Sequence, residues 1–407
     1  VVEAQNRPGG RLGSIRHDGH ILDLGFQVLF THFPALHRLL DLEALQLHRI
    51  DSGAILRLDD RFLDFENPLM SHKPMDLFRS IQAPFMTWTD KIQIGKMTLE
   101  LMSKPADQIL KSKPLGTVRE YLAAQGFSGK FVQQFVRPFF GGIFLSQDLQ
   151  ADARLFRLYW KMLITGGVAL PEGGMQAVPD QLADRLGRDR LRLGAPVAAL
   201  KREGGGRATG VRLASGETLE ADVVVLALDY PSLVKLVDLP GSFEGNATTN
   251  LYFESPKPLI TSRKVLLNGS GEGWIDLVCQ TSNIAPSYAP EGKHQIAIQL
   301  LENPDLEDEA LCRHVQDEVH AWVPSHDVRA WKPLEVMRIP FGQFRQEPSV
   351  MDALPGPRLG EGLYLASELT TASNYDGAVR GGERAARAIR EDEGTLRRSI
   401  DRERQMS

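Results

Sequence analysis

The first eleven residues combine chemical groups suited to holding a nucleotide. They read Val-Val-Glu-Ala-Gln-Asn-Arg-Pro-Gly-Gly-Arg, which is the end of an apolar strand, an acidic tip and a glycine turn flanked by arginines. In a dinucleotide-binding βαβ unit, an acidic residue at the end of the second strand holds the ribose hydroxyls, about 20 residues after a glycine-rich turn. Glu3 occupies that position, and Ala4 follows it.

The glycine turn itself suits phosphate oxygens. Gly9 and Gly10 let the backbone approach closely and adopt positive φ, while Arg7 or Arg11 can offer a bidentate guanidinium. Taken alone, this turn is more typical of a solvated surface loop, but its position directly after Val-x-Glu favours binding. No Gly-x-Gly-x-x-Gly turn precedes Glu3, so we expect that about 30 residues of the unit are missing before Val1.

The middle of the chain contains the strands that must support such a site. Residues 197–201, 209–213 and 219–228 are three β-rich pieces, and the glycines at 204–206 predict a hairpin turn. The last piece includes an apolar run at 223–228 that is typical of a parallel strand buried on both faces.

Near the C-terminus, a strand at 363–366 is followed by a predicted helix that begins near Asp376. A helix N-terminus there could direct its positive end toward anionic oxygens. Its predicted inner face is made of small residues, so that a backbone or a flat ring can lie close: Ala378, Gly381, Gly382, Ala385, Ala386 and Ala388.

In this order, the segments resemble the FAD-dependent superfamily that contains amine oxidases, phytoene desaturases and protoporphyrinogen oxidases. The resemblance begins with Val-x-Glu-Ala, the arginine-flanked turn and Asp23-Leu-Gly25. It continues with Pro171-Glu-Gly-Gly-Met175 before a helix at 179–186. It ends with Gly362-Leu-Tyr-Leu-Ala-Ser-Glu368, Gly377-Ala378 and Gly381-Gly382. Its implied cofactor is FAD.

The resemblance implies an α/β fold, with a Rossmann-like FAD-binding domain of the glutathione-reductase-like type and a second, discontinuous α+β substrate domain. We expect residues 1–66, 165–240 and 355–407 in the first domain, and 67–164 and 241–354 in the second. Within the second, the patterns predict helices at 118–125 and 131–136, the latter ended by Pro138, and strands at 265–269, 274–278 and 295–301.

The resemblance also implies the residues of the flavin site. The expected cofactor-binding residues are Glu3, Ala4, Arg7, Gly9, Gly10, Arg11, Gly25, Phe26, Gln27, Val197, Glu368, Gly377 and Ala378. Asp23 and residues 25–27 would lie beside the isoalloxazine ring, with Tyr375 and Lys332 as candidate catalytic residues. Val197 is equally explained by core packing, and Glu368 stands where the family usually has Asp.

The implied activity is an FAD-dependent oxidoreductase of desaturase or oxidase type that accepts a hydride from a hydrophobic or flat substrate, such as a carotenoid, a porphyrinogen or an amine. Ile339-Pro-Phe-Gly is closer to the desaturase and porphyrinogen oxidase branches. Because a flavin carries the chemistry, no acid–base residue need be visible. The alternative is a flavin-fold binding or scaffold protein, or an inactive fragment without its phosphate-binding loop. The electron acceptor stays open.

Composition excludes several other classes of protein. The chain has 407 residues, a formal net charge of −5 and no basic stripe, which argues against a nucleic-acid partner. His314, His320 and His326 recur every six residues and do not share a helical face, so no metal site is expected.

The cellular context is also constrained by composition. Two cysteines in so long a chain favour a reducing compartment, with the cytoplasm as the expected location. The longest apolar run, 223–228, is far too short to cross a bilayer. A lipophilic substrate would still be compatible with peripheral membrane contact.

Overall fold

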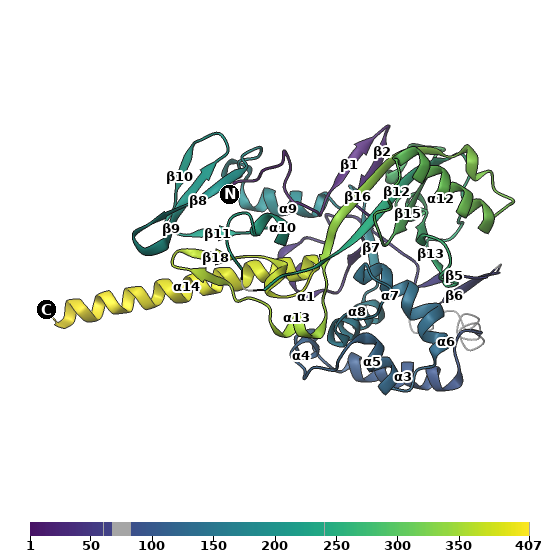
Figure 1. Cartoon of the computed structure of the whole chain (residues 1–407), viewed down its shortest axis with the longest axis horizontal. Helices are drawn as coiled ribbons and strands as arrows, with labels where there is room; N and C mark the ends of the chain where they lie inside the picture. The colour runs from purple at the N-terminus through teal and green to yellow at the C-terminus, as the bar shows by residue number, and fades with distance from the viewer. Residues whose placement is uncertain (60, 67–82, 240, 407) are drawn as a thin grey trace. The chain divides into compact units, whose positions relative to one another are not determined.

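The computed structural model describes residues 1–59, 61–66, 83–239 and 241–406 (Figure 1). By its internal contacts the chain divides into two compact units, each assembled from separated segments. The first unit is Val1–Gly10, Ala183–Glu244 and Ser349–Ser407. The second unit is Arg11–Leu182 and Gly245–Pro348.

The first unit contains a small sheet in which β11 (Val224–Leu226) pairs in parallel with β18 (Leu363–Leu365), and β18 pairs antiparallel with β17 (Arg358–Gly360). The prediction of a parallel strand is confirmed, but burial on both faces is wrong. Val225 is 43% exposed because its side chain points to the opposite face from Val224 and Leu226, and only their face is covered by the described residues.

The long helix α14 (Tyr375–Met406) begins where the sequence predicts and packs against β18. Ala385 and Ala388 share a buried cluster with Tyr364. A Cβ on Gly381 would lie 2.4 Å from the carbonyl oxygen of Ser367, so only glycine lets the helix approach this closely. Gly382, by contrast, borders open space.

An antiparallel sheet completes the first unit. It consists of β8 (Val197–Glu203), β9 (Arg207–Leu213) and β10 (Thr218–Glu220), joined between β8 and β9 by the predicted turn η3 (Gly204–Gly206). The N-terminal residues lie beside the segment that precedes β8, because Val2 forms a parallel bridge with Arg192. The remaining elements are η2 (Arg188–Arg190), α10 (Tyr230–Leu233) and η6 (Glu368–Thr370).

The second unit is built on a seven-stranded sheet of order β16-β12-β15-β14-β13-β5-β6. These strands are β16 (Lys332–Phe344), β12 (Gly245–Ser255), β15 (His294–Leu300), β14 (Ile275–Cys279), β13 (Val265–Asn268), β5 (Gly53–Leu58) and β6 (Arg61–Glu66). All pair antiparallel except β13 with β5. The three strands predicted here are confirmed to within two residues.

Each face of this sheet is covered by a different helix. On one face, Leu311, Val315 and Val319 of α12 (Asp308–Trp322) pack into a core with Ile298 and Leu300 of β15. Side chains alternate along a strand, so Gln299 points to the opposite face, toward α7 (Arg137–Phe144). That second face therefore carries the polar residues discussed below.

A group of helices precedes and follows α7 (Figure 1). It comprises α3 (Trp88–Met102), α4 (Ala106–Leu110), α5 (Val118–Ala124), α6 (Gly129–Phe131), the π-helical η1 (Val132–Val136) and α8 (Ala153–Thr165). Pro138 does not end a helix as predicted. It lies in the first turn of α7, where its missing N–H is tolerated, and the preceding π-helical turn takes up the irregularity.

The remaining elements of the second unit are short. They are β1 (Ser14–His17), β2 (His20–Asp23), β3 (Leu29–Phe30), α1 (Pro34–Leu39), β4 (Leu47–Arg49), β7 (Val168–Pro171), α11 (Thr281–Ile284), η4 (Pro286–Tyr288) and η5 (Val328–Ala330). Helices α9 (Ala177–Leu186) and α13 (Pro348–Asp352) lie at the unit boundaries. Both cysteines are free and buried. None of the helices in the described ranges is long and apolar enough to cross a membrane.

Candidate functional site

The N-terminal strand end is fixed by backbone hydrogen bonds within the first unit. The N–H of Glu3 donates to the carbonyl of Arg192 at 2.9 Å, and the N–H of Ala195 donates to the carbonyl of Glu3 at 2.8 Å. The Glu3 carboxylate accepts from the N–H of Gln5 at 2.8 Å. A carboxylate has room for about four donors, so it can still accept ribose hydroxyls.

The glycine turn has the backbone conformation that its sequence predicts. Gly9 and Gly10 have φ of +112° and +58°, and a Cβ on Gly10 would meet nothing within 4 Å. The Arg7 guanidinium braces the turn by donating to the carbonyl of Gly10 at 2.7 Å. Arg11 belongs to the second unit, where its guanidinium donates to the carbonyl of Gly342 in β16.

The start of α14 is a tightly packed turn. The N–H of Gly377 donates to the side chain of Asn374 at 2.7 Å, and a Cβ on Gly377 would lie 1.9 Å from the carbonyl oxygen of Ala372. Glu368, 7% exposed, accepts from the Ser373 hydroxyl at 3.0 Å. Tyr375 is the first residue of α14, and Val197 is the first residue of β8 and is half-buried.

In the second unit, Asp23 joins two motifs that lie about 150 residues apart. Its carboxylate accepts from the Ser14 hydroxyl at 2.6 Å, the Met175 N–H at 2.9 Å and the Tyr288 hydroxyl at 2.9 Å. The hydroxyl of Tyr252 donates to its backbone carbonyl at 2.8 Å. Burial raises the pKa of Asp23 to about 6, against the lowering effect of the three donors. One carboxylate therefore locks Asp23-Leu-Gly25 to the Gly-Gly-Met segment.

Residues 25–27 are held against the large sheet. The N–H of Phe26 donates to Asn250 Oδ1 of β12 at 2.9 Å. A Cβ on Gly25, whose φ is +88°, would lie 3.0 Å from Ile339 of β16. Gln27 donates to the carbonyls of Leu24 and Arg11 at 2.7 and 2.9 Å. The shape of this predicted flavin-facing segment is thus set by contacts with the sheet.

The sheet face beneath this segment carries buried polar residues that sequence reasoning missed. Asn250 of β12 pairs in register with Gln299 of β15. Asp276 of β14 is 1% exposed and accepts from Gln147 at 2.7 Å. Its second oxygen and Gln299 Oε1 have no hydrogen-bond partner among the described residues. Both lie near Gly142 of α7, at 3.1 and 3.3 Å from where its Cβ would be.

Both oxygens lie near the same point of α7, and a buried oxygen acceptor without a donor is unfavourable. Burial raises the pKa of Asp276 to about 7, with Arg137 opposing the shift only partly. A neutral carboxyl group would supply the missing donor. An acidic residue inside an apolar strand was the one sequence signal that could have identified this position.

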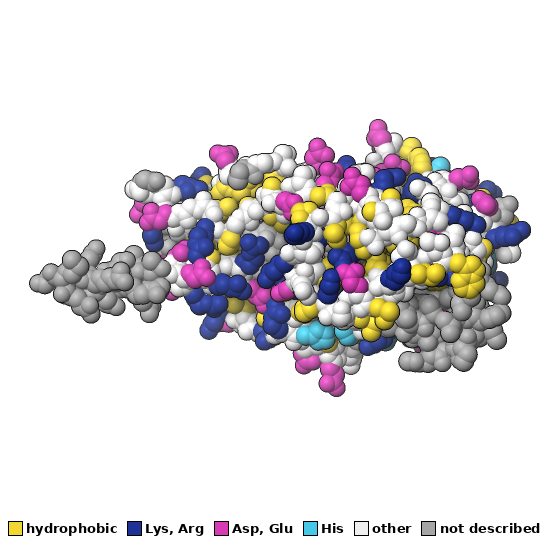
Figure 2. All heavy atoms as spheres, turned by 90° about the horizontal axis from the view of Figure 1, so that it is seen from below, with side chains coloured by type: hydrophobic (Ala, Val, Ile, Leu, Met, Phe, Trp, Pro, Cys, Tyr) yellow, Lys and Arg dark blue, Asp and Glu magenta, His cyan; other side chains and the backbone are white. Residues whose placement is uncertain are grey.

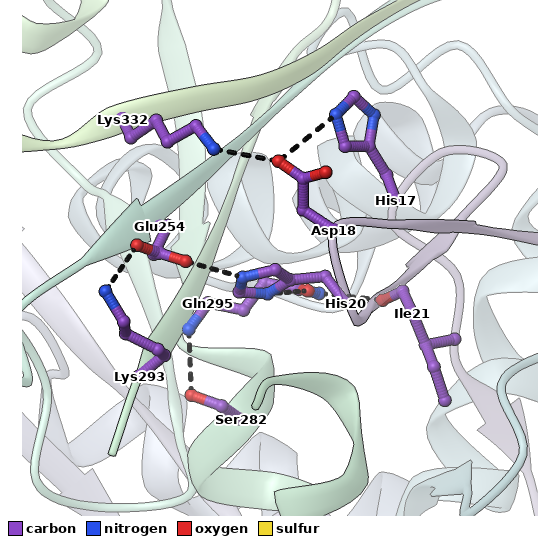
Figure 3. Close-up of polar contacts among 9 residues, drawn as sticks. All are labelled: His17, Asp18, His20, Ile21, Glu254, Ser282, Lys293, Gln295 and Lys332. Carbon is purple, nitrogen blue, oxygen red and sulfur yellow. Dashed lines mark hydrogen bonds and ion pairs between the residues drawn. The ribbon is translucent and has the colours of Figure 1, made fainter. Parts of the chain in front are cut away.

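A second polar cluster, centred on His20, ties the β1–β2 hairpin to the sheet (Figure 3). His20 is fully buried, with Nδ1 3.1 Å from Gln295 Oε1 and Nε2 3.1 Å from Glu254. Gln295 donates its amide hydrogens to the Ile21 carbonyl and the Thr281 hydroxyl, at 3.0 and 2.9 Å, which fixes its oxygen toward His20. Each ring nitrogen therefore faces a side-chain oxygen of the sheet, one on β15 and one on β12.

Lys332, the candidate lysine of the active site, lies at the edge of the same view (Figure 3). It is the first residue of β16, and its side chain is 58% exposed. Its ammonium group lies 2.8 Å from the carboxylate of Asp18, which lowers the pKa of Asp18.

A comparison of the chain with models of known protein families identifies its family. The profile of the flavin containing amine oxidoreductases matches residues 1–390. The chain belongs to this family. That membership confirms the resemblance predicted from the motifs, and with it the implied flavin cofactor.

Two curated relatives match over short stretches. The zeta-carotene-forming phytoene desaturase of Myxococcus xanthus is 43% identical over 76 residues, which is 18% of this chain and 14% of the relative. The hydroxyneurosporene desaturase of Cereibacter sphaeroides is 52% identical over 71 residues, 17% of this chain and 14% of the relative. The matched part therefore spans about one seventh of each relative's length.

Solved structures agree over nearly the whole chain. An oxidoreductase from Methanosarcina mazei has a TM-score of 0.68 at 17% identity, covering 94% of this chain and 92% of that one. A variant of putrescine oxidase has a TM-score of 0.66 at 18% identity, covering 96% and 93%. At identities this low, the structural similarity establishes the fold alone. It confirms the predicted α/β flavoprotein fold class.

The residues of this flavin containing amine oxidoreductase fit FAD in the first unit. The open Gly9–Gly10 turn, the spare acceptor capacity of Glu3 and the compact start of α14 are the groups that an adenine dinucleotide requires. The individual binding residues and the boundaries of the FAD and substrate domains stay predictions. No cluster of three or more metal-ligating side chains occurs among the described residues.

Proposed function

We propose that this protein is an FAD-dependent oxidoreductase of desaturase or oxidase type that takes a hydride from a hydrophobic or flat substrate. The family match over residues 1–390 carries this proposal. When bound, FAD supplies the hydride acceptor, so the side chains need only bind and orient the two molecules. The names of the two curated relatives support a carotenoid-like substrate over a porphyrinogen or an amine.

In the proposed site, Glu3 accepts the ribose hydroxyls and the Gly9–Gly10 turn, braced by Arg7, binds phosphate oxygens. The positive end of α14, which begins at the compact turn before Gly377, would favour the anionic cofactor. In the second unit, Asp23 and Asn250 fix the shape of residues 25–27, the segment that the motif resemblance assigns to the isoalloxazine ring. The proposal includes a cytoplasmic location, which the two free cysteines support.

The test uses protein expressed from its complete gene. FAD binding is measured by titration, and flavin reduction is then followed anaerobically with carotenoid precursors, a porphyrinogen and aliphatic amines. We expect bound flavin that is bleached by a lipophilic polyene. Protein that takes up no FAD would contradict the proposal, and flavin that no substrate reduces would favour the scaffold alternative.

Replacing Glu3 by Gln tests the nucleotide site directly. Hydrogen bonds to a charged acceptor contribute about 1.5–3 kcal/mol, so the dissociation constant for FAD should rise about tenfold or more. The matched control is Glu361→Gln, since Glu361 is a 69% exposed acidic residue of the same unit that pairs with Arg207. Equal FAD affinity of the two variants would remove Glu3 from the site.

A further inference from the structure

Helix α3 exposes an apolar stripe of four large side chains, with Gly95 between the second and the third. Trp88, Ile92, Leu99 and Met102 are 69%, 56%, 72% and 59% exposed. Their spacing of four, seven and three residues places all four side chains on one side of the helix. Residues on the other side, such as Leu101, are buried where α3 packs against α8. The helix thus has apolar side chains on both sides, and the described residues cover only one of them.

Scattered exposed apolar residues are ordinary, but this stripe runs from the first residue of α3 to the last. At 1.5 Å per residue it is roughly 20 Å long. Figure 2 views the molecule from the side on which α3 lies in Figure 1, and apolar side chains reach the surface there among lysines and arginines. The packing of α3 on α8 does not require these four side chains.

The surroundings of the stripe are basic. Lys91 and Lys96 border it on its two sides, and the Lys91 ammonium lies 4.6 Å from the centre of the Trp88 ring. Residues 88–131 contain seven Lys or Arg and four Asp or Glu, although the whole chain has a net charge of −5. One of those acids, Asp90, is buried in the N-terminal capping box of α3.

We propose that α3 docks this protein on the surface of an anionic lipid bilayer, with the stripe inserted at the level of the headgroups. An apolar face bordered by lysines, with a Trp at one end, has the composition of helices that lie in a membrane interface. Its 15 residues are too few to span a bilayer. In a symmetric pair of chains, lysines bordering both stripes would repel each other, which favours lipid over a second copy. The proposal is independent of the flavin chemistry.

The first experiment measures binding of the full-length protein to vesicles by sedimentation. Vesicles of phosphatidylcholine alone are compared with vesicles that contain phosphatidylglycerol as well. The test variant carries both Ile92→Gln and Leu99→Gln. The matched control carries Val234→Gln and Leu306→Gln, because these two apolar residues lie outside α3 and are 43% and 39% exposed. Withdrawing one large apolar side chain from water is worth roughly tenfold in partition, so the test variant should bind about a hundredfold more weakly. The control should bind like the wild type.

The second experiment locates the contact. Brominated acyl chains should quench Trp fluorescence in the wild type, and Trp88→Phe should remove most of that quenching. Lys96→Glu should weaken binding to the anionic vesicles and leave binding to the neutral vesicles unchanged. Arg313→Glu on α12 should change neither. Thermal unfolding checks that each variant is folded.

Three results would overturn the proposal. The first is wild-type protein that binds neither kind of vesicle. The second is vesicle binding that the Ile92→Gln, Leu99→Gln variant retains in full. The third is a dimer without vesicle affinity that the same variant dissociates, which would assign the stripe to a second copy of the chain.

Discussion

Asp276 gives the sharpest test of the buried polar face of the sheet, because ionisation of its carboxyl group should lower the free energy of unfolding. Its pKa is raised from 3.8 to about 7 by burial. At 1.36 kcal/mol per unit, a rise of about three units corresponds to about 4 kcal/mol against the ionised folded state. The folded state binds the proton more tightly than the unfolded one, so the free energy of unfolding falls as pH rises from about 4 to about 7.

Replacing Asp276 by Asn should remove this loss. The amide has the same shape, its oxygen can accept from Gln147, and its NH₂ group can donate to the unpartnered oxygen of Gln299. We expect wild type and variant to be nearly equal at pH 4. Above pH 7 the variant should be more stable by up to about 4 kcal/mol.

Urea unfolding followed by circular dichroism at pH 4.5, 6 and 8 measures this difference. Hydrogen exchange in the β14 peptide provides a local reading of the same effect. The control is Asp317→Asn on α12, where the carboxylate is 63% exposed and the difference should stay flat with pH. A variant that is less stable than wild type at pH 8 would show that the ionised carboxylate of Asp276 stabilises the folded state, and it would refute the reasoning.

Two further predictions concern single contacts. Gly381→Ala should destabilise the protein by about 2 kcal/mol or more, because its Cβ would lie 2.4 Å from a backbone oxygen, whereas Gly382→Ala should stabilise it by about 0.5–1 kcal/mol because that site is open. Thermal unfolding compares the two, and equal effects would contradict the close packing of α14. His20→Phe should destabilise the protein by about 1–3 kcal/mol, because the buried oxygen of Gln295 loses its partner, and unchanged thermal stability would contradict the assigned hydrogen bonds.

Local sequence patterns determined much of this protein. Turn glycines, apolar runs and the helix start at Asp376 depend on neighbouring residues, so the strands β8, β13, β14 and β15 and the helices α5 and α14 could be predicted to within a few residues. The predicted piece at 219–228 is instead two strands, β10 and β11. The order of the motifs was enough to indicate the flavin family, since each motif carries its own backbone geometry. Pro138 was misplaced because a π-helical turn and an α-helix start have no distinct short-range pattern.

Only the tertiary structure decided which distant groups meet. Ser14, Tyr252 and Tyr288 converge on Asp23 through strand register and chain crossings that no local spacing encodes. The same holds for the unpartnered oxygens of Asp276 and Gln299, which adjacent strands bring together beneath α7. The sequence shows that α3 is apolar, but which of its two sides is covered depends on packing against α8. Burial is a property of the assembled fold, so the buried polar groups and the exposed apolar stripe can be identified only in the tertiary structure.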